Sequence, residues 1–376
     1  MSALFTPLKL GGITIPNRLG MSAITRNRSS KTVPNEIMKQ YYEQRAVGGA
    51  GLIVTEGTLI TPQGTEWPDA PGIWNQEQIE GWKKITDAVH APLVVNLFPA
   101  LAPHPEAPEQ IAAGVPVYAP SAISAPGGKF RYLEGAPGYV IPTEIADPTV
   151  IIAQFKQAAI NAKEAGFDGV ELLGGNGYLV HQFLDSLLNT LRALIEVYGP
   201  DVAIKLNPAG GYNDVGMPLQ ETIATFGYLL REVDKLKLSY VALFRYMLRR
   251  LDPDLDGSFP RDYTVWVAPR LDRQDPECDG LSVCPFYFAV SVSVPPNTHI
   301  FVSGSVMPAE AEELVSGKAA GVFLGLTWIC HPDLGKRIRA GMELDTVPDY
   351  ETLYVVHNNP AVGILTTRRL FIRSWK

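Results

Sequence analysis

The sequence is poor in cysteine and has no long hydrophobic run, and each shortage excludes a class of protein. Its three cysteines cannot all pair and show no metal-ligand spacing, so we expect reduced thiols and no metal site. No apolar run approaches the roughly 20 residues that span a bilayer, and the N-terminus does not resemble a secretion signal. We therefore expect a cytoplasmic protein without membrane insertion.

An excess of positive charge is also absent. Asp and Glu number 39 against 32 Lys and Arg, which gives a formal net charge of −7, and no basic run occurs. Nucleic acids and anionic membranes are bound through clustered basic residues, so neither is expected as a partner. A small hydrophobic substrate is the expected ligand. Whether the chain forms a homodimer is left open.

The sequence does contain apolar runs of strand length, which alternate with amphipathic stretches that carry helix-start residues. Such starts are Asn75, Asp147-Pro148 and Met307-Pro308. Eight parallel strands with intervening helices predict an α/β fold, a closed (β/α)8 TIM barrel, with an open doubly wound sheet as the alternative. The expected strands are residues 19–22, 51–55, 93–97, 169–173, 202–206, 240–243, 299–303 and 322–324.

We expect a single domain over residues 1–376. Three of its segments depart from the alternation of strands and helices. Gly11-Gly12 separates two alternating runs and predicts an N-terminal β-hairpin that caps one end of the barrel. Residues 99–142 are rich in Pro, Gly and Ala and predict a long loop over the active face. Residues 249–294 mix charged turns with aromatic runs, which fits either a pocket-lining hairpin or a surface insertion.

Residues 168–185 are the stretch around which the rest of the chain is organised. A short strand runs into a glycine-rich turn and then a helix, which delivers Asn176 and Tyr178 to the barrel mouth, where such folds place their chemistry. Tyr178 either acts as an acid or packs, and Asn176 either contacts a ligand or caps the helix. His181, one helical turn later, is expected to be a packed or solvated helix residue.

Two charged residues are expected to point into the barrel. Strand alternation aims Glu171 and Lys205 inward together with Leu173 and Asn207. The two charges form either a structural buried ion pair, which we prefer, or a catalytic acid/base pair. Glu56, after the second strand, is expected to be a solvated loop carboxylate.

Short motifs occur in a fixed order along most of the chain outside the two irregular segments. They are residues 4–11 (Leu-Phe-Thr-Pro-Leu-Lys-Leu-Gly), 15–19, 41–46, 51–57, 71–74, 81–90, 176–179, 182–185 and 332–334. Together they resemble the old yellow enzyme family of flavin-dependent ene-reductases. The resemblance implies the barrel fold.

That family binds FMN and reduces activated alkenes. Flavin N5 delivers a hydride, a tyrosine donates a proton, and a His/Asn pair polarises the substrate carbonyl. By resemblance the tyrosine is Tyr178 and the asparagine is Asn176. The histidine falls on Leu173, which cannot donate a hydrogen bond, so one of the two donors to the substrate carbonyl is absent.

The positions that match the family's flavin-ring contacts are altered as well. Thr25 matches the threonine near the ring, whereas Asn96, Phe98 and Lys205 stand where the family has Gln, Trp and Arg. Lys205 keeps a positive charge but lacks the planar fork of arginine.

At the phosphate, the family's Gly-Gly turn falls on Gly304-Ser305, and its arginine falls on Leu326, directly after Gly325. Charge-assisted hydrogen bonds contribute about 1.5–3 kcal/mol each, so their loss weakens FMN binding by orders of magnitude. We therefore expect the protein to need no cofactor, with retained FMN as the alternative.

The expected function is a flavin-independent cyclase or isomerase of a hydrophobic, conjugated specialised-metabolite intermediate, working by acid and hydrogen-bond catalysis. The alternative is an FMN-dependent, NADPH-driven ene-reductase of α,β-unsaturated carbonyls, and a non-enzymatic ligand-binding remnant is the third reading. The expected catalytic residues are Tyr178, Asn176, Lys205 and Glu171. The expected substrate-binding residues are Leu173, Phe98, Asn96 and Thr25, and the FMN contacts of the alternative are Thr25, Asn96, Lys205, Gly304, Ser305 and Gly325.

Overall fold

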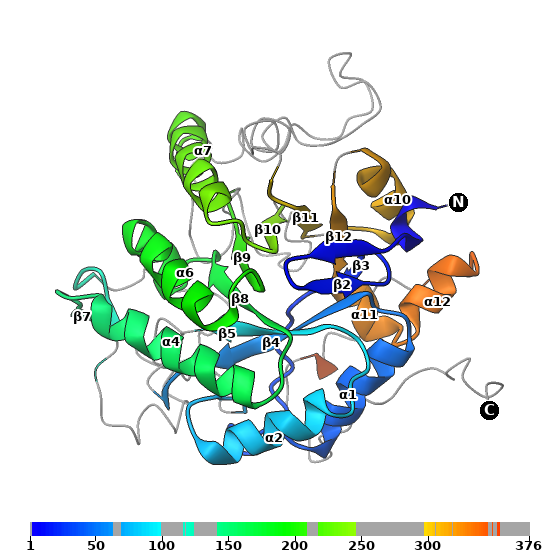
Figure 1. Ribbon diagram of the computed structural model, residues 1–376, viewed down its shortest axis with the longest axis horizontal. Coiled ribbons are helices and arrows are strands. Elements are labelled where there is room, and N and C mark those ends of the chain that lie inside the picture. Colours follow the sequence, from blue (N-terminus) through cyan, green and yellow to red (C-terminus); the bar gives the residue numbers. More distant parts are fainter. Residues whose placement is uncertain are drawn as a thin grey trace, which may run out of the picture.

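Eight parallel strands close into a barrel, which confirms the predicted fold (Figure 1). The computed structural model describes residues 2–62, 69–98, 116, 118–123, 141–208, 217–245, 297–304, 306–317, 319–344, 348, 352 and 353. Around the barrel the strands follow the order β10-β11-β12-β3-β4-β5-β8-β9. They are β3 (Leu19–Met21), β4 (Leu52–Leu59), β5 (Leu93–Phe98), β8 (Gly169–Gly174), β9 (Val202–Leu206), β10 (Tyr240–Phe244), β11 (Ile300–Ser303) and β12 (Gly321–Leu324).

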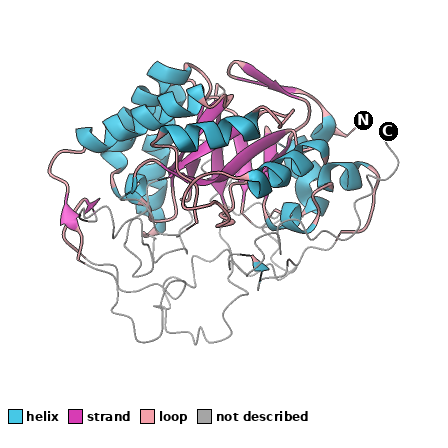
Figure 2. Ribbon diagram, turned by 90° about the horizontal axis from the view of Figure 1, so that it is seen from below, coloured by secondary structure: helices cyan, strands magenta, loops and turns pink. Residues whose placement is uncertain are grey.

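Helices form a ring around the barrel (Figures 1 and 2). Asn75 caps the start of α2 in a capping box. Its side chain accepts a hydrogen bond from Gln78 N, and the Gln78 side chain accepts one from Asn75 N. Within the described residues, no helix combines the length and the apolar character needed to cross a membrane. The helices are α1 (Glu36–Val47), α2 (Gln76–Thr86), α4 (Thr149–Glu164), α5 (Leu179–Gln182), α6 (Leu184–Tyr198), α7 (Leu219–Lys235), α10 (Pro308–Gly317), α11 (Leu326–Cys330), α12 (Leu334–Arg339) and the 3-10 turn η1 (Ala3–Phe5).

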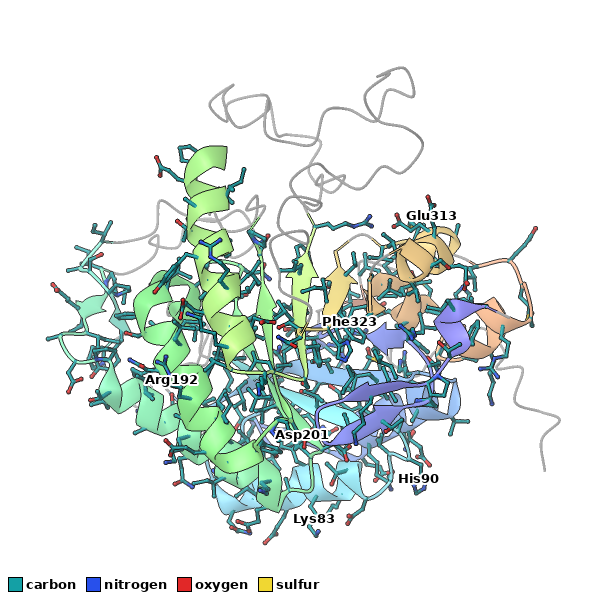
Figure 3. The ribbon with its side chains drawn as sticks, turned by 45° about the horizontal axis from the view of Figure 1, so that its top comes forward. Lys83, His90, Arg192, Asp201, Glu313 and Phe323 are labelled. Atoms are coloured by element: carbon teal, nitrogen blue, oxygen red, sulfur yellow. The ribbon has the colours of Figure 1, made fainter. Side chains whose placement is uncertain are left out.

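The predicted hairpin, β1 (Leu8–Leu10) with β2 (Ile13–Ile15), closes one end of the barrel. Gly11 takes a φ of +52°, which glycine adopts without strain. Gly12 N donates to Asp201, which directly precedes β9, and Figure 3 shows Asp201 beside the hairpin. The hairpin therefore covers the end where the strands begin and leaves the opposite mouth for a site.

Strand β4 continues four residues beyond its predicted end. Its register against β5 shifts between Val54 and Gly57, and Thr55 Oγ1 accepts a hydrogen bond from Asn96 N at 3.1 Å. The buried polar pair Thr55-Glu56 interrupts the apolar run, which is why hydrophobic periodicity ends the strand too early.

The two irregular segments fall mainly outside the described residues. Residues 249–294 do so completely, and of residues 99–142 only 116, 118–123, 141 and 142 are described. The latter part includes β6 (Tyr118–Ala119), which pairs in parallel with β7 (Thr143–Glu144). The expected roles of both segments stay predictions.

Candidate functional site

A buried carboxylate lies at the centre of a polar cluster inside the barrel. Glu171 on β8 accepts from Asn96 Nδ2 on β5 and from the hydroxyl of Tyr240 on β10, each at 2.8 Å. All three side chains are 1% exposed. Sequence reasoning aimed Glu171 inward but missed Tyr240, because nothing in a strand pattern shows which hydroxyl crosses the barrel to a carboxylate. The side chain of Phe98, two residues after Asn96, lies outside the described residues.

Lys205 on β9 is the buried cation of this cluster. Its Nζ donates to Ser22 Oγ across the barrel at 3.4 Å and lies 5.3 Å from the ring centroid of Phe244. Burial raises the pKa of Glu171 and lowers the pKa of Lys205, and the charge of each opposes the shift of the other. The expected ion pair is thus two buried charges that stabilise each other through space while their atoms contact different partners.

The chain leaves β8 through a left-handed turn that leads to Tyr178. Asn176 and Gly177 have φ angles of +61° and +78°, a region that asparagine and glycine tolerate. Tyr178, and not Asn176, is the N-cap residue of α5, so of the two alternatives for Asn176 the helix cap is wrong. Gly177 N donates to Nδ1 of His181 at 3.1 Å, which ties the turn to the helix.

Leu173 and Tyr178 belong to an apolar wall at the barrel mouth. The wall consists of Leu59, Ala70, Leu173 and Tyr178, with Trp74 packed against them. Leu173 is 6% exposed and Tyr178 is 7% exposed. Aliphatic carbon therefore occupies the position at which the resemblance places a histidine, and this wall suits an apolar ligand.

His181 is expected to make stability depend on pH. Burial lowers the pKa of His181 from 6.5 to about 4. Between these two pH values the unfolded chain binds a proton at this side chain and the folded chain does not. Stability contributed by neutral His181 is complete above pH 6.5 and is lost as the pH falls towards 4, on the order of 3 kcal/mol in total. Urea unfolding of wild type and His181→Asn across this interval measures the effect.

His90→Asn is the matched control, because His90 is an exposed histidine in the loop between α2 and β5. We expect His181→Asn, which keeps an acceptor for Gly177 N, to flatten the pH dependence between 4 and 6.5, and His90→Asn to leave it unchanged. Equal slopes in wild type and His181→Asn would contradict the assignment.

Glu56 is a buried anchor, which corrects the expectation of a solvated loop carboxylate. It is 2% exposed and accepts hydrogen bonds from Arg26 N at 3.0 Å, Asn27 N at 3.2 Å and the Tyr42 hydroxyl at 3.3 Å. Burial raises its pKa, and these donors oppose the shift. Glu56 holds the segment that directly follows Thr25, a half-buried residue, because backbone donors from another loop satisfy the carboxylate.

Two glycines follow the neighbouring strands β11 and β12 at the mouth. Gly304 has a φ of +82°, and a Cβ there would lie 2.7 Å from the carbonyl oxygen of Arg245. A Cβ on Gly325 would lie 2.7 Å from Cδ1 of Ile24. A Cβ is therefore excluded at both strand ends, because the carbonyl oxygen of Arg245 and the side chain of Ile24 already occupy that space.

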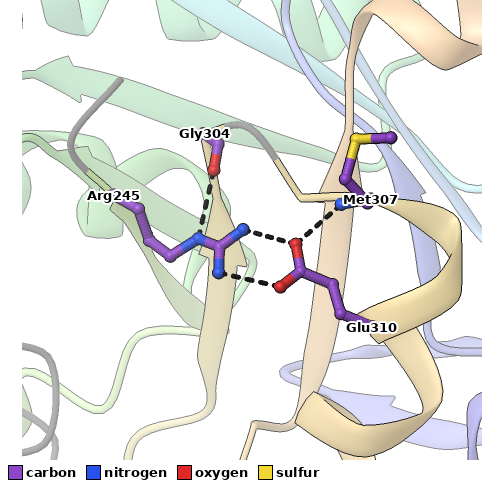
Figure 4. Close-up of polar contacts among 4 residues, drawn as sticks. All are labelled: Arg245, Gly304, Met307 and Glu310. Atoms are coloured by element: carbon purple, nitrogen blue, oxygen red, sulfur yellow. Dashed lines mark hydrogen bonds and ion pairs between the residues drawn. The ribbon is translucent and has the colours of Figure 1, made fainter. Parts of the chain in front are cut away.

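The side chain of Arg245 holds the turn after β11 through hydrogen bonds (Figure 4). Its Nε donates to Gly304 O at 3.2 Å, and its two terminal nitrogens donate to the carboxylate of Glu310 at 3.1 and 2.6 Å. Glu310 also accepts from Met307 N at 2.7 Å. Sequence reasoning missed this clamp, and Ser305 within the turn lies outside the described residues. Among described residues, no group of three His, Cys, Asp or Glu side chains is placed to hold a metal.

Asn207 is a further site residue to which sequence reasoning assigned no role. Strand alternation aims it inward with Lys205, and its Nδ2 donates to Oδ1 of Asn176 at 2.9 Å. The predicted site residues Asn176, Tyr178, Leu173 and Lys205 thus come together on the ends of β8 and β9.

Comparisons with known proteins agree on one kind of relative. The family model described as NADH:flavin oxidoreductase / NADH oxidase matches residues 3–192. An NADP-dependent oxidoreductase of Aspergillus flavus is 33% identical over 94% of this chain and 93% of its own length. A flavin oxidoreductase of Emericella nidulans is 30% identical over 94% of each chain. The match to the solved structure of morphinone reductase covers 96% of this chain and 95% of the morphinone reductase chain, with a TM-score of 0.77 at 27% identity.

The expectation that no cofactor is needed is therefore wrong, because the matching model is that of flavin oxidoreductases. That expectation counted the changed residues around the flavin, including the altered Gly304-Ser305 turn. Gly304, Gly325 and the buried cation of Lys205 are nevertheless present in the fold.

Proposed function

We propose a function from one premise: the chain belongs to the NADH:flavin oxidoreductase / NADH oxidase family. We infer that it is an FMN-dependent oxidoreductase that uses NADPH to reduce the carbon–carbon double bond of small, hydrophobic α,β-unsaturated carbonyl compounds. The observation that carries this proposal is Tyr178 at the start of α5, set in an apolar wall and two residues from Asn176.

The residues at the barrel mouth fit FMN. Lys205 offers a buried cation and Thr25 a hydroxyl for the polar edge of the ring. Gly304 and Gly325 carry no side chain, so a phosphate at the ends of β11 and β12 would meet main-chain N–H groups without a Cβ of these residues in between. Leu326 adds no charge beside the phosphate, so we expect weaker retention of FMN than an arginine at that position would give.

The chemistry that bound FMN would supply is hydride transfer from NADPH to the substrate alkene. The amide of Asn176 donates to the carbonyl oxygen and draws electron density away from the double bond. The hydroxyl of Tyr178 donates a proton to the carbon next to the carbonyl, so that one hydride and one proton saturate the bond. The wall around Leu173 excludes water from the reacting atoms.

The apolar wall also selects the substrate class. A carboxylate or phenolate lying against Leu173 would lose water without gaining a second hydrogen bond, and this desolvation is costly. A neutral enone or enal pays little for the same contact, because only its carbonyl oxygen needs a donor. We therefore infer a preference for neutral, hydrophobic carbonyl compounds.

We expect FMN to bind the purified protein and raise its thermal midpoint. A ligand at 100 times its dissociation constant adds about 2.7 kcal/mol to the free energy of unfolding. The loaded protein should show a flavin absorbance spectrum and oxidise NADPH when cyclohex-2-en-1-one is added. Riboflavin, which has the ring but no phosphate, is the control ligand and should stabilise less. A colourless protein with no thermal shift and no NADPH oxidation would contradict the proposal.

A cyclase or isomerase of a conjugated carbonyl compound is the second candidate function. Leu173 favours it, because a single hydrogen-bond donor activates an alkene for hydride attack less than two donors do. Proton transfer from Tyr178 would serve this chemistry as well. Rearranged product formed from a conjugated carbonyl compound without NADPH consumption distinguishes this candidate from the reductase.

A further inference from the structure

The ends of β8 and β9 bring two asparagine side chains together. The strands pair in parallel through Gly174 and Leu206, so Asn207 lies beside the first residue of the turn that carries Asn176. Asn207 Nδ2 donates to Asn176 Oδ1 over 2.9 Å. Gly175 permits this approach, because a Cβ at that position would lie 2.8 Å from the backbone nitrogen of Asn207.

This hydrogen bond favours one orientation of the Asn176 amide. A carboxamide carries an acceptor oxygen on one side and a donor NH2 group on the other. With Oδ1 engaged by Asn207, the donor Nδ2 points to the other side of the amide. The left-handed backbone of Asn176, at a φ of +61°, fixes the Cα–Cβ direction from which the amide extends.

Asn207 is held in the interior at a cost. Its side chain is 1% exposed, and its Oδ1 is buried with no hydrogen-bond partner within the described structure. An unsatisfied buried acceptor costs about 1–3 kcal/mol. An aliphatic side chain would avoid this cost, so the amide at position 207 calls for a role in the site.

We propose that Asn207 is a positioning residue that turns Asn176 for carbonyl recognition, so that the site takes neutral enones and enals through one fixed donor. The inference rests on the proposed function. Leu173 supplies no second donor, so recognition depends on the orientation of Asn176. If the amide of Asn176 were turned the other way, its oxygen would face the substrate carbonyl, and two acceptor oxygens repel each other. Asn207 acts through Asn176.

A double-mutant cycle between Asn207→Leu and Asn176→Ala tests this role. The readouts are the dissociation constant of cyclohexanone, an unreactive carbonyl probe, measured by calorimetry, and KM for cyclohex-2-en-1-one. We expect Asn207→Leu to raise both about tenfold, which corresponds to about 1.4 kcal/mol and is the size of one hydrogen bond. The FMN content should not change. In the Asn176→Ala background Asn207→Leu should change neither constant, because no amide remains to be oriented.

Asn207→Ala is the second variant, which deletes the amide without adding aliphatic bulk, and thermal unfolding shows that each variant is folded. An equally large effect of Asn207→Leu without Asn176 overturns the inference, since Asn207 would then act on the fold in general. Unchanged cyclohexanone binding in Asn207→Leu also overturns it. Failure of the proposed function looks different: wild type oxidises no NADPH with the enone, while cyclohexanone binding still reports on the orientation of the amide.

Discussion

Tyr178→Phe is expected to lower kcat for enone reduction by roughly 10²–10⁴-fold, the contribution of a positioned general acid. The phenylalanine ring preserves packing against Leu59, Ala70 and Leu173 and removes only the hydroxyl that donates the proton. FMN content and KM should change little, because neither depends on that hydroxyl in the proposed mechanism. Steady-state kinetics with NADPH and cyclohex-2-en-1-one, together with the flavin spectrum, measure these quantities.

Tyr198→Phe is the matched control for this substitution. Tyr198 is 7% exposed, and its hydroxyl donates to Phe167 O at 3.4 Å within the helical layer, away from the barrel mouth. It should retain wild-type kcat. A Tyr178→Phe enzyme that reduces the enone at the wild-type rate would exclude Tyr178 as the proton donor.

Lys205→Met is expected to lower the free energy of unfolding by about 3–5 kcal/mol, the cost of leaving a buried charge without its counter-charge. Glu171 would keep its hydrogen bonds from Asn96 and Tyr240 but lose the nearby cation that favours its ionised form. Combining Lys205→Met with Glu171→Gln should recover most of the loss, because the buried charge is then gone. Urea unfolding of the single and double variants measures both effects.

The loss in the free energy of unfolding caused by Lys205→Met should also be smaller at low pH. Burial raises the pKa of Glu171 above its unfolded value, and removing Lys205 raises it further. The folded state then binds a proton that the unfolded state has lost, so the loss measured at about pH 8 should be smaller at about pH 5. Lys84→Met, at an exposed lysine on α2, is the control and should have little effect at either pH. A pH-independent cost would contradict the assignment of Glu171 as the buried charge.

Local pattern was enough for the architecture. All eight predicted strands are present, because a barrel strand buried on both faces is a short apolar run that needs no knowledge of its partners. The hairpin followed from Gly11-Gly12, and the family followed from motifs that stay in order along the chain. The cytoplasmic location, the homodimer and the single domain over residues 1–376 stay predictions.

Several site features depended on contacts between distant parts of the chain. Glu56 became a buried anchor because backbone donors 30 and 29 residues away in sequence reach it. The cofactor prediction failed for a related reason. It weighed individual changed positions around one ligand, whereas the match to the flavin oxidoreductase family extends over residues 3–192.

The sequence by itself determined the barrel, its hairpin cap and the inward direction of Glu171 and Lys205, since each follows from residue type and periodicity along one segment. The resemblance to a known family added that Leu173 stands where that family has a histidine. Only the tertiary structure decided that Asn207 donates a hydrogen bond to Asn176, that Tyr240 and Asn96 hold Glu171, and that Arg245 holds the Gly304 turn. The physical reason is that a hydrogen bond requires two groups at a set distance and angle. Strand pairing around the closed barrel sets both, and no single segment encodes them.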